Sequence, residues 1–168
     1  EPPLMGQTPE EQGVIAMWEH RVEWDGFIAG SEVLRNSAER MKGRALTGSL
    51  GFEQIPELAE RGKRRITHLY EMLDERFAEA KHLAGDGFTV ADITALIAVD
   101  FVRRQKLEIP ENCPNVKRWH DLVSARPSAS SSTSSSAAIE STPLPGVSLA
   151  RSKCSSKLMR SSPAKTRW

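Results

Sequence analysis

Side chains that could do chemistry are few in this sequence and far apart. The histidines, which could bind a metal or move a proton, lie at four separated positions: His20, His68, His82 and His120. None of them forms an HxxxH pair or a Cys/His cluster, and Cys113 and Cys154 stand alone without a CxxC motif. The segment 48–51 has no lysine and no strand-to-helix context, so it is not a phosphate loop. We therefore assign no catalytic residue and no metal site.

A hydroxyl and a carboxylate, Thr89 and Asp92, could be mistaken for a catalytic pair. They stand three residues apart before an apolar run, which is the spacing of a capping box at the start of a helix. Phe88 and Ile93 occupy the two positions of the accompanying hydrophobic staple. We interpret all four as structural residues.

Another carboxylate, Asp100, lies inside the same apolar run. A buried carboxylate needs a partner, and Arg103 and Arg104 follow on the next turn of the helix. We interpret Asp100 as half of a structural ion pair in preference to a functional acid.

The elements that must position these residues are helices, and the first begins at Thr8. Thr8 can cap this helix, Pro9 suits its first position, and Glu11 completes a capping box. Its apolar residues form two adjoining stripes at helical spacing. The second stripe consists of Met17, Trp24, Phe27 and Ile28. Two stripes indicate that one face packs against the domain itself and the other against something else.

A long connection is expected after the first helix. Gly26 and Gly30 mark where the helix bends or ends, and residues 31–54 contain three more glycines and no sustained period. Loops of this length in compact domains are often functional. Arg35 and Arg44 lie in it, and each could either bind a ligand carboxylate or be solvated.

A second helix is predicted over about 56–81. Its inward stripe is Leu58, Ile66, Leu69, Leu73 and Phe77. Gly62 lies in register with this stripe and costs about 1 kcal/mol relative to alanine, so it predicts a close approach of another helix. On the opposite face, Glu57–Arg61 and Glu60–Arg64 have the i,i+4 spacing of exposed ion pairs.

Two further helices follow. The third runs from the cap at Thr89 to about Lys106 and is apolar nearly all round, which predicts a buried central helix. The fourth runs from about Pro114 to about Ala125, where Arg126-Pro127 ends it.

The composition changes after Pro127. The chain of 168 residues has a net charge of +1, but acids outnumber bases up to Pro127, whereas 128–168 carries six Lys or Arg and one acid. This Ser-rich, low-complexity tail shows no period and predicts disorder. Its charges are spread out without aromatic residues interleaved among them, so we interpret the tail as solvated and expect neither a nucleic acid nor a membrane as partner.

Compartment follows from what the sequence lacks. No signal peptide opens the chain, and its longest apolar stretch, 90–102, is too short to span a bilayer. Unpaired cysteines favour a reducing compartment. We expect a cytoplasmic protein, and because the chain does not begin with Met, its start is not necessarily the start of its gene.

Three runs resemble one family. The run 83–93, LAGDGFTVADI, resembles the motif that begins the buried central helix of the glutathione S-transferase C-terminal domain. The run PNVKRW at 114–119 looks like that family's next helix, and the run ARPS at 125–128 looks like the end of that helix. The start, PPLMG at 2–6 followed by Thr8 to Glu11 and Trp18, resembles the junction between its two domains. The similarity covers about residues 2–128.

The resemblance implies an all-α helical bundle of this C-terminal type. Residues 1–7 would then be the remnant of an interdomain linker, 8–127 the helical domain, and 128–168 a tail without counterpart in the family. The family's thioredoxin-like domain, which supplies the Ser, Tyr or Cys that activates the glutathione thiol, does not precede Glu1. The resemblance therefore implies no catalytic residue in this chain.

The implied site is half of a substrate pocket. In the family the first helix borders the cleft for the apolar electrophile, which makes Trp24, Phe27 and Ile28 candidate substrate-binding residues, although such stripes are also core or interface. Arg35 becomes a candidate for a glutathione carboxylate. Glutathione would be the co-substrate, with no tightly bound cofactor, and the protein would be a homodimer.

Three functions stay open from the sequence. The chain is the substrate-pocket and dimerisation half of a glutathione S-transferase, inactive on its own; or it is a non-catalytic interaction module of the same fold; or it is a fragment without function.

Overall fold

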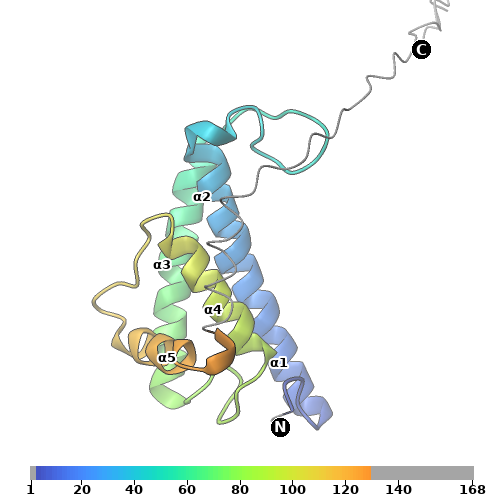
Figure 1. Ribbon diagram of the computed structural model, residues 1–168, viewed down its shortest axis with the longest axis vertical. Coiled ribbons are helices and arrows are strands. Elements are labelled where there is room, and N and C mark those ends of the chain that lie inside the picture. The colour runs from blue at the N-terminus through green and yellow to red at the C-terminus, as the bar shows by residue number, and fades with distance from the viewer. Residues whose placement is uncertain (1–2, 130–168) are drawn as a thin grey trace, which may run out of the picture.

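The computed structural model describes residues 3–129 of the chain (Figure 1). Residues 1–2 of the expected linker and most of the Ser-rich tail, 130–168, lie outside the described residues. Within 3–129 the structure is all-helical, with two isolated β-bridges and no strand, which confirms the predicted fold class.

One long rod runs along the side of the molecule (Figure 1). It consists of α1 (Pro9–Val22), a π-helix η1 (Glu23–Ile28) and α2 (Ala29–Ser37). The predicted cap is confirmed, because the backbone N–H of Glu11 donates to Thr8 Oγ1 at 3.2 Å and that of Thr8 to Glu11 Oε2 at 3.3 Å. The backbone N–H of Gln7, which donates to Glu11 Oε2 at 2.7 Å, and that of Thr8 lower the pKa of Glu11.

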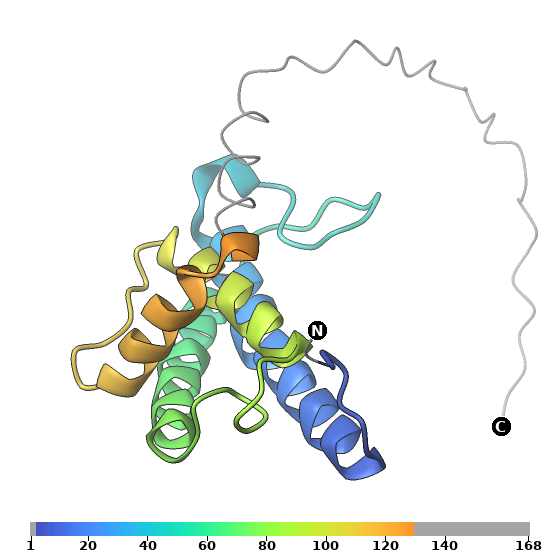
Figure 2. The same ribbon diagram turned by 60° about the horizontal axis from the view of Figure 1, so that its bottom comes forward.

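The prediction of a long connection over 31–54 is wrong at its start, because the helix continues to Ser37. Gly30 does not end it. A Cβ at Gly30 would lie 2.8 Å from Val102 and 2.9 Å from Phe101, so the glycine serves the close packing of α4 on the rod. A 3₁₀ turn, η2 (Glu39–Met41), follows, and residues 42–55 form a strap that projects from the end of the bundle (Figure 2).

α3 (Pro56–Glu79) returns beside the rod and packs against α2. The predicted close approach at Gly62 is confirmed, since a Cβ there would lie 2.7 Å from the carbonyl oxygen of Ala29. The predicted ion pairs along α3 are wrong: Glu60 pairs with Lys63 and Arg61 reaches across to Glu32 of α2. An exposed arginine takes the partner that tertiary packing brings near, not only its neighbour on the same helix.

α4 (Val90–Arg103) packs on α1 and η1, but it is not buried on every side. Its inner face is Ala91, Asp92, Ala95, Ala98, Val99 and Val102, all buried. On its outer face Ile97 is 51% exposed, so the predicted all-round burial is wrong for this chain. An apolar outer face is what a further layer of protein would cover.

α5 (Pro114–Ser124) packs against α3, and both of its ends are as predicted to within a residue. Its cap comes from another helix: Asp74 of α3 accepts the backbone N–H groups of Asn115 at 2.7 Å and Val116 at 3.1 Å. In the core between them, the rings of Phe77 and Trp119 stack with centroids 4.7 Å apart.

Candidate substrate pocket

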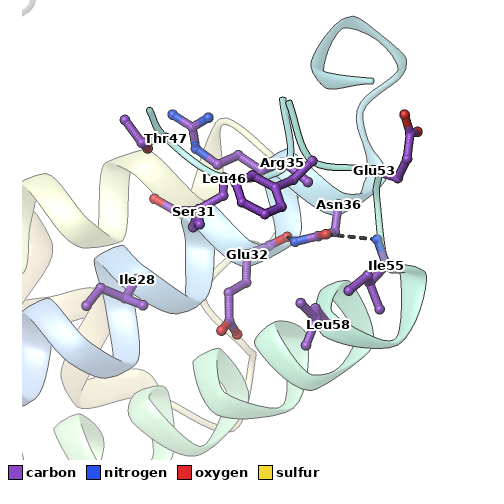
Figure 3. A pocket seen from close by; sticks show the side chains of 12 residues that line it. Ile28, Ser31, Glu32, Arg35, Asn36, Leu46, Thr47, Glu53, Ile55 and Leu58 are labelled. Carbon is purple, nitrogen blue, oxygen red and sulfur yellow. Dashed lines mark hydrogen bonds between the residues drawn. The ribbon is translucent and has the colours of Figure 1, made fainter. Parts of the chain in front are cut away.

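A cavity of about 520 Å³ lies between α2, the strap and the first turn of α3, beside two of the predicted site residues (Figure 3). Its lining residues are Ile28, Ser31, Glu32, Arg35, Asn36, Ala45, Leu46, Thr47, Phe52, Glu53, Ile55 and Leu58. This volume falls within the range of small-molecule sites.

The strap is held in place at its base. Gln54 donates from Nε2 to the carbonyls of Arg35 and Ala38, both at 2.8 Å, and so satisfies acceptors at the open end of α2. Asn36 accepts the backbone N–H of Ile55 at 3.0 Å, a bond drawn in Figure 3. Higher up, the backbone N–H of Ala45 donates to the carbonyl of Phe52 at 3.1 Å. These bonds position the apolar side chains of the strap over α2.

The walls of the cavity are mostly apolar, with a few polar groups. Leu46 and Phe52 come from the strap and are 59% and 44% exposed, whereas Leu58 is contributed by α3. Glu32 and Arg35 come from α2, and Figure 3 shows the Glu32 carboxylate turned toward α3 and the Arg35 guanidinium toward the strap. Apolar walls with few convergent polar groups are typical of ligand sites.

Arg35 is the cationic group of this cavity. Its Nη1 donates to the carbonyl of Arg44 at 3.1 Å, which leaves further donors of the guanidinium for a ligand. Arg44 does not line the cavity, because its guanidinium turns back to the carbonyl of Arg40 at 2.6 Å. Of the two arginines predicted as carboxylate ligands, only Arg35 is placed to meet one here.

The four predicted substrate-binding residues are not brought together. Ile28 and Arg35 line the cavity. Trp24 lies outside it, 53% exposed, with His20 stacked on its ring at 6.3 Å. Phe27 turns to the other side of the rod and stacks on Phe101 of α4 at 5.3 Å. Their roles in substrate binding stay predictions.

Sequence reasoning missed the residues that the strap contributes. Leu46, Phe52 and Ile55 fall in a segment without helical period and were assigned no role. The available signal was their apolar character, since a solvated loop has little reason to carry three large apolar residues.

The predicted capping residues surround the start of α4. Asp92 is fully buried, and its Oδ2 accepts from the backbone N–H of Thr89 at 3.0 Å. Its Oδ1 accepts from the backbone N–H of Leu83 at 2.9 Å and from Trp119 Nε1 at 3.0 Å. Asp92 therefore joins a loop, α4 and α5, which is more than a local cap does. Phe88 and Ile93, the predicted staple, are both half-buried.

His82 lies against this carboxylate. Its Nδ1 is 3.6 Å from Asp92 Oδ1 and has no hydrogen-bond partner within the described part of the chain. Burial lowers the pKa of His82, and the nearby Asp92 only partly opposes that effect. The histidine is a core residue with a polar edge, not a ligand-facing group.

Asp100 is not buried as expected, because its side chain is 42% exposed. The predicted partner Arg103 is present, with Nη1 at 3.8 Å, but His120 Nε2 is nearer at 2.8 Å.

Burial raises the pKa of the Cys113 thiol, which favours an unreactive thiol at that position. None of the helices described is both long and apolar enough to cross a membrane.

Comparison with known proteins gives a consistent result. The family model described as glutathione S-transferase, C-terminal domain, matches residues 37–127. Glutathione S-transferase 2 of Saccharomyces cerevisiae is 30% identical over 127 residues, which cover 76% of this chain and 52% of that protein. The disulfide-bond oxidoreductase YfcG of Escherichia coli is 31% identical over 75 residues, 45% of this chain and 34% of that protein.

Solved structures agree with these relatives. The crystal structure of Gtt2 from Saccharomyces cerevisiae superimposes with a TM-score of 0.69 at 29% identity. A glutathione S-transferase domain-containing protein of Marinobacter aquaeolei VT8 gives a TM-score of 0.68 at 32% identity. Both matches cover 77% of this chain and 60% of the other. The chain thus spans about half the length of the curated relative that it matches over most of its residues.

Proposed function

The chain belongs to the glutathione S-transferase family, and from that premise we propose that it is the substrate-pocket and dimerisation half of a glutathione-conjugating enzyme. The observation that carries this proposal is the 520 Å³ cavity, in which Ile28 and Arg35 lie together with the apolar residues of the strap. The structural relatives at 29% and 32% identity support it.

In the intact enzyme the reaction would be attack of the glutathione thiolate on an electrophilic carbon, with the thiolate forming the new bond and the leaving group departing. Catalysis would gain from a lowered thiol pKa and from holding the two substrates side by side. We assign this half the apolar wall for the electrophile, and we assign Arg35 to a carboxylate of glutathione. Thiol activation would belong to the thioredoxin-like half of the family.

The proposed setting is a homodimer in the cytoplasm, with glutathione and a small apolar electrophile as substrates. The exposed apolar residues of the rod support an assembly, since Met17, Trp24 and Ile28 lie along one uncovered side. The free, buried thiol of Cys113 is compatible with a reducing compartment.

A chimaera tests this proposal. The thioredoxin-like half of the yeast relative would be joined ahead of Glu1, and conjugation of glutathione to a chromogenic electrophile would be measured. We expect turnover by the chimaera and none by the unmodified chain, which should also pass through a column of immobilised glutathione.

Pocket variants of the chimaera identify the site. Leu58→Arg places a charge in the cavity and should raise the KM for the electrophile, whereas Arg64→Met, on an exposed position of the same helix, should leave it unchanged. Robust turnover by the unmodified chain, or an unchanged KM in the Leu58→Arg chimaera, would refute the assignment.

A non-catalytic interaction module is the second candidate. It is favoured by the exposed apolar residues of the strap, of which Leu50 is 70% exposed and does not line the cavity. The genomic sequence upstream of Glu1 discriminates between the two. An open frame encoding a thioredoxin-like fold supports the enzyme, and a stop codon followed by a promoter supports the module.

A further inference from the structure

The π-helix η1 is the irregular part of the long rod, and it lies directly before the cavity. It spans Glu23–Ile28, between two regular α-helical segments, and its last residue is Ile28 of the cavity wall. An extra residue in one turn breaks the regular ladder of backbone hydrogen bonds, and such segments occur frequently at functional sites. What holds η1 in this geometry therefore bears on the pocket.

One side chain that contacts η1 from another helix is Arg65 of α3. Its Nη2 donates to the backbone carbonyl of Trp24 at 2.6 Å, and its guanidinium lies over the Trp24 ring at 5.4 Å from the centroid. The same Nη2 donates to Asp25 Oδ1 at 3.1 Å, and Nε donates to that oxygen at 3.2 Å. A backbone carbonyl, a ring and a carboxylate of η1 thus all contact one guanidinium.

Arg65 also reaches the cavity through Glu32. Its Nη1 donates to Glu32 Oε2 at 3.4 Å, and Arg61 binds the other carboxylate oxygen. The Glu32 side chain is 19% exposed and lines the cavity, but Figure 3 shows its carboxylate turned away from Arg35 and toward α3. Arg61 and Arg65 therefore neutralise an acid that would otherwise face the apolar wall.

We propose that Arg65 is a positioning residue of the pocket: it holds the π-helix that ends at Ile28, and it keeps the charge of Glu32 away from the cavity. This role rests on the proposed function in taking the cavity as the substrate site. Lysine could not replace it, because a point charge cannot serve the Trp24 carbonyl, Asp25 and Glu32 at once as the planar guanidinium does.

Two apolar fluorescent probes test the charge role in the chain as it exists. Anilinonaphthalene sulfonate is anionic, and phenylnaphthylamine is its uncharged parent. In Arg65→Met we expect the Kd of the anionic probe to rise about tenfold, which corresponds to about 1.4 kcal/mol of binding free energy. The Kd of the uncharged probe should rise only about twofold to threefold. The double variant Glu32→Gln/Arg65→Met should restore the affinity for the anionic probe. The control Arg64→Met should change neither Kd.

Hydrogen exchange tests the structural role without any ligand. In Arg65→Met and Arg65→Lys the amides of 23–29 should exchange faster than in the unsubstituted chain, whereas Arg64→Met should leave them protected. Arg65→Lys should keep much of the affinity for the anionic probe, because it retains the charge beside Glu32. The conservative variant therefore separates the two roles.

The outcomes are distinguishable. Two results would overturn the positioning role. In the first, Arg65→Met binds each probe as tightly as the unsubstituted chain does. In the second, Arg65→Met loses affinity for the two probes equally, and adding Glu32→Gln does not restore it. In Leu58→Arg the new side chain fills the cavity. If this variant binds the probes as tightly as the unsubstituted chain does, the cavity is not the site. That result overturns the proposed function and this role with it, and the ligand-free exchange data tell it apart from a failure of the Arg65 contacts.

Discussion

At the scale of single residues, Asp92 carries more of the structure than its place in a capping box requires. Its two oxygens accept from Thr89, Leu83 and Trp119, which come from the start of α4, the preceding loop and α5. A buried N–H that loses its acceptor costs about 1–3 kcal/mol, because it cannot turn to water instead. Three such groups depend on one side chain.

Asp92→Ala should therefore lower the free energy of unfolding by about 3–5 kcal/mol. The measurement is equilibrium unfolding in urea, followed by tryptophan fluorescence because Trp119 is one of the donors. Asp86→Ala, at an exposed position of the same loop, is the matched control and should change stability little. A loss below about 1 kcal/mol, the size of one ordinary cap, would contradict the three-way role.

His82 should make stability depend on pH. Burial lowers its pKa in the folded state from the ordinary value of 6.5, while Asp92 opposes and Lys81 and Arg126 reinforce the shift. The unfolded chain then binds a proton that the folded chain refuses, so the stability contribution is complete above 6.5 and is lost as the pH falls through the folded-state pKa.

Urea midpoints measured from pH 7.5 to 5 should fall less steeply in His82→Gln than in the unsubstituted chain. His68→Gln, at an exposed histidine, is the control. Identical slopes in the His82→Gln and unsubstituted chains would show that the histidine does not contribute.

At the scale of elements, the glycines of the rod and of α3 differ in what surrounds them. A Cβ at Gly62 would meet the backbone carbonyl of Ala29 at 2.7 Å and the side chain of Val33 at 2.8 Å, whereas nothing lies within 4 Å of the one at Gly13. Alanine favours a helix by about 1 kcal/mol over glycine at either position. At Gly13 this preference comes without any rearrangement, whereas at Gly62 the helices α2 and α3 must move apart to make room for the alanine side chain.

Gly62→Ala should therefore destabilise the fold by about 1–3 kcal/mol, since backbone must shift. Gly13→Ala should instead stabilise it by up to about 1 kcal/mol. Thermal unfolding of the two variants gives opposite signs if the contact between α2 and α3 is as close as described. Equal signs would contradict it.

Features that depend on neighbouring residues could be predicted from the sequence, whereas features that depend on tertiary contacts could not. The caps at Thr8 and Thr89 depend on residues three positions away, so both were predictable. The continuation of the rod past Gly30 depends on Phe101 and Val102, which only the fold brings there. An isolated reading of Gly30 therefore gives a helix end where the chain has a packing contact.

The candidate pocket divides in the same way. Ile28 belongs to the first helix, whose apolar pattern could be read from the sequence, whereas Arg35 was predicted in the connection that follows; both line the cavity. Phe52 reaches it only because Gln54 and Asn36 tie the strap to α2, and bonds of this kind leave no periodic trace in a sequence. The same holds for Glu32, whose partners Arg61 and Arg65 are about thirty residues away.

At the scale of the whole molecule, apolar side chains are left uncovered on more than one side. Met17 and Trp24 lie on the rod, Leu46 and Leu50 on the strap, and Ile97 on the outer face of α4. Contiguous apolar surface on a protein favours association. This follows from the side chains themselves and does not require the cavity to have any function.

The chain should therefore self-associate at high concentration in light-scattering measurements. Trp24→Glu places a charge in the middle of the uncovered side of the rod and should shift the mass toward the monomer. Gln12→Glu, at an exposed and already polar position of α1 in the same rod, is the control and should leave the association unchanged. A monodisperse monomer at high concentration would count against this expectation.

The cap that Asp74 lends to α5 has a consequence for the order of folding. A helix of 11 residues is marginal in water by itself, and this one takes the acceptor for its first amides from a residue 41 positions earlier in the chain. While the polypeptide is being made, α5 thus has no stable start until α3 has formed and presents that carboxylate. A peptide cut to 110–129 should remain a coil, and α5 belongs to the late steps of assembly.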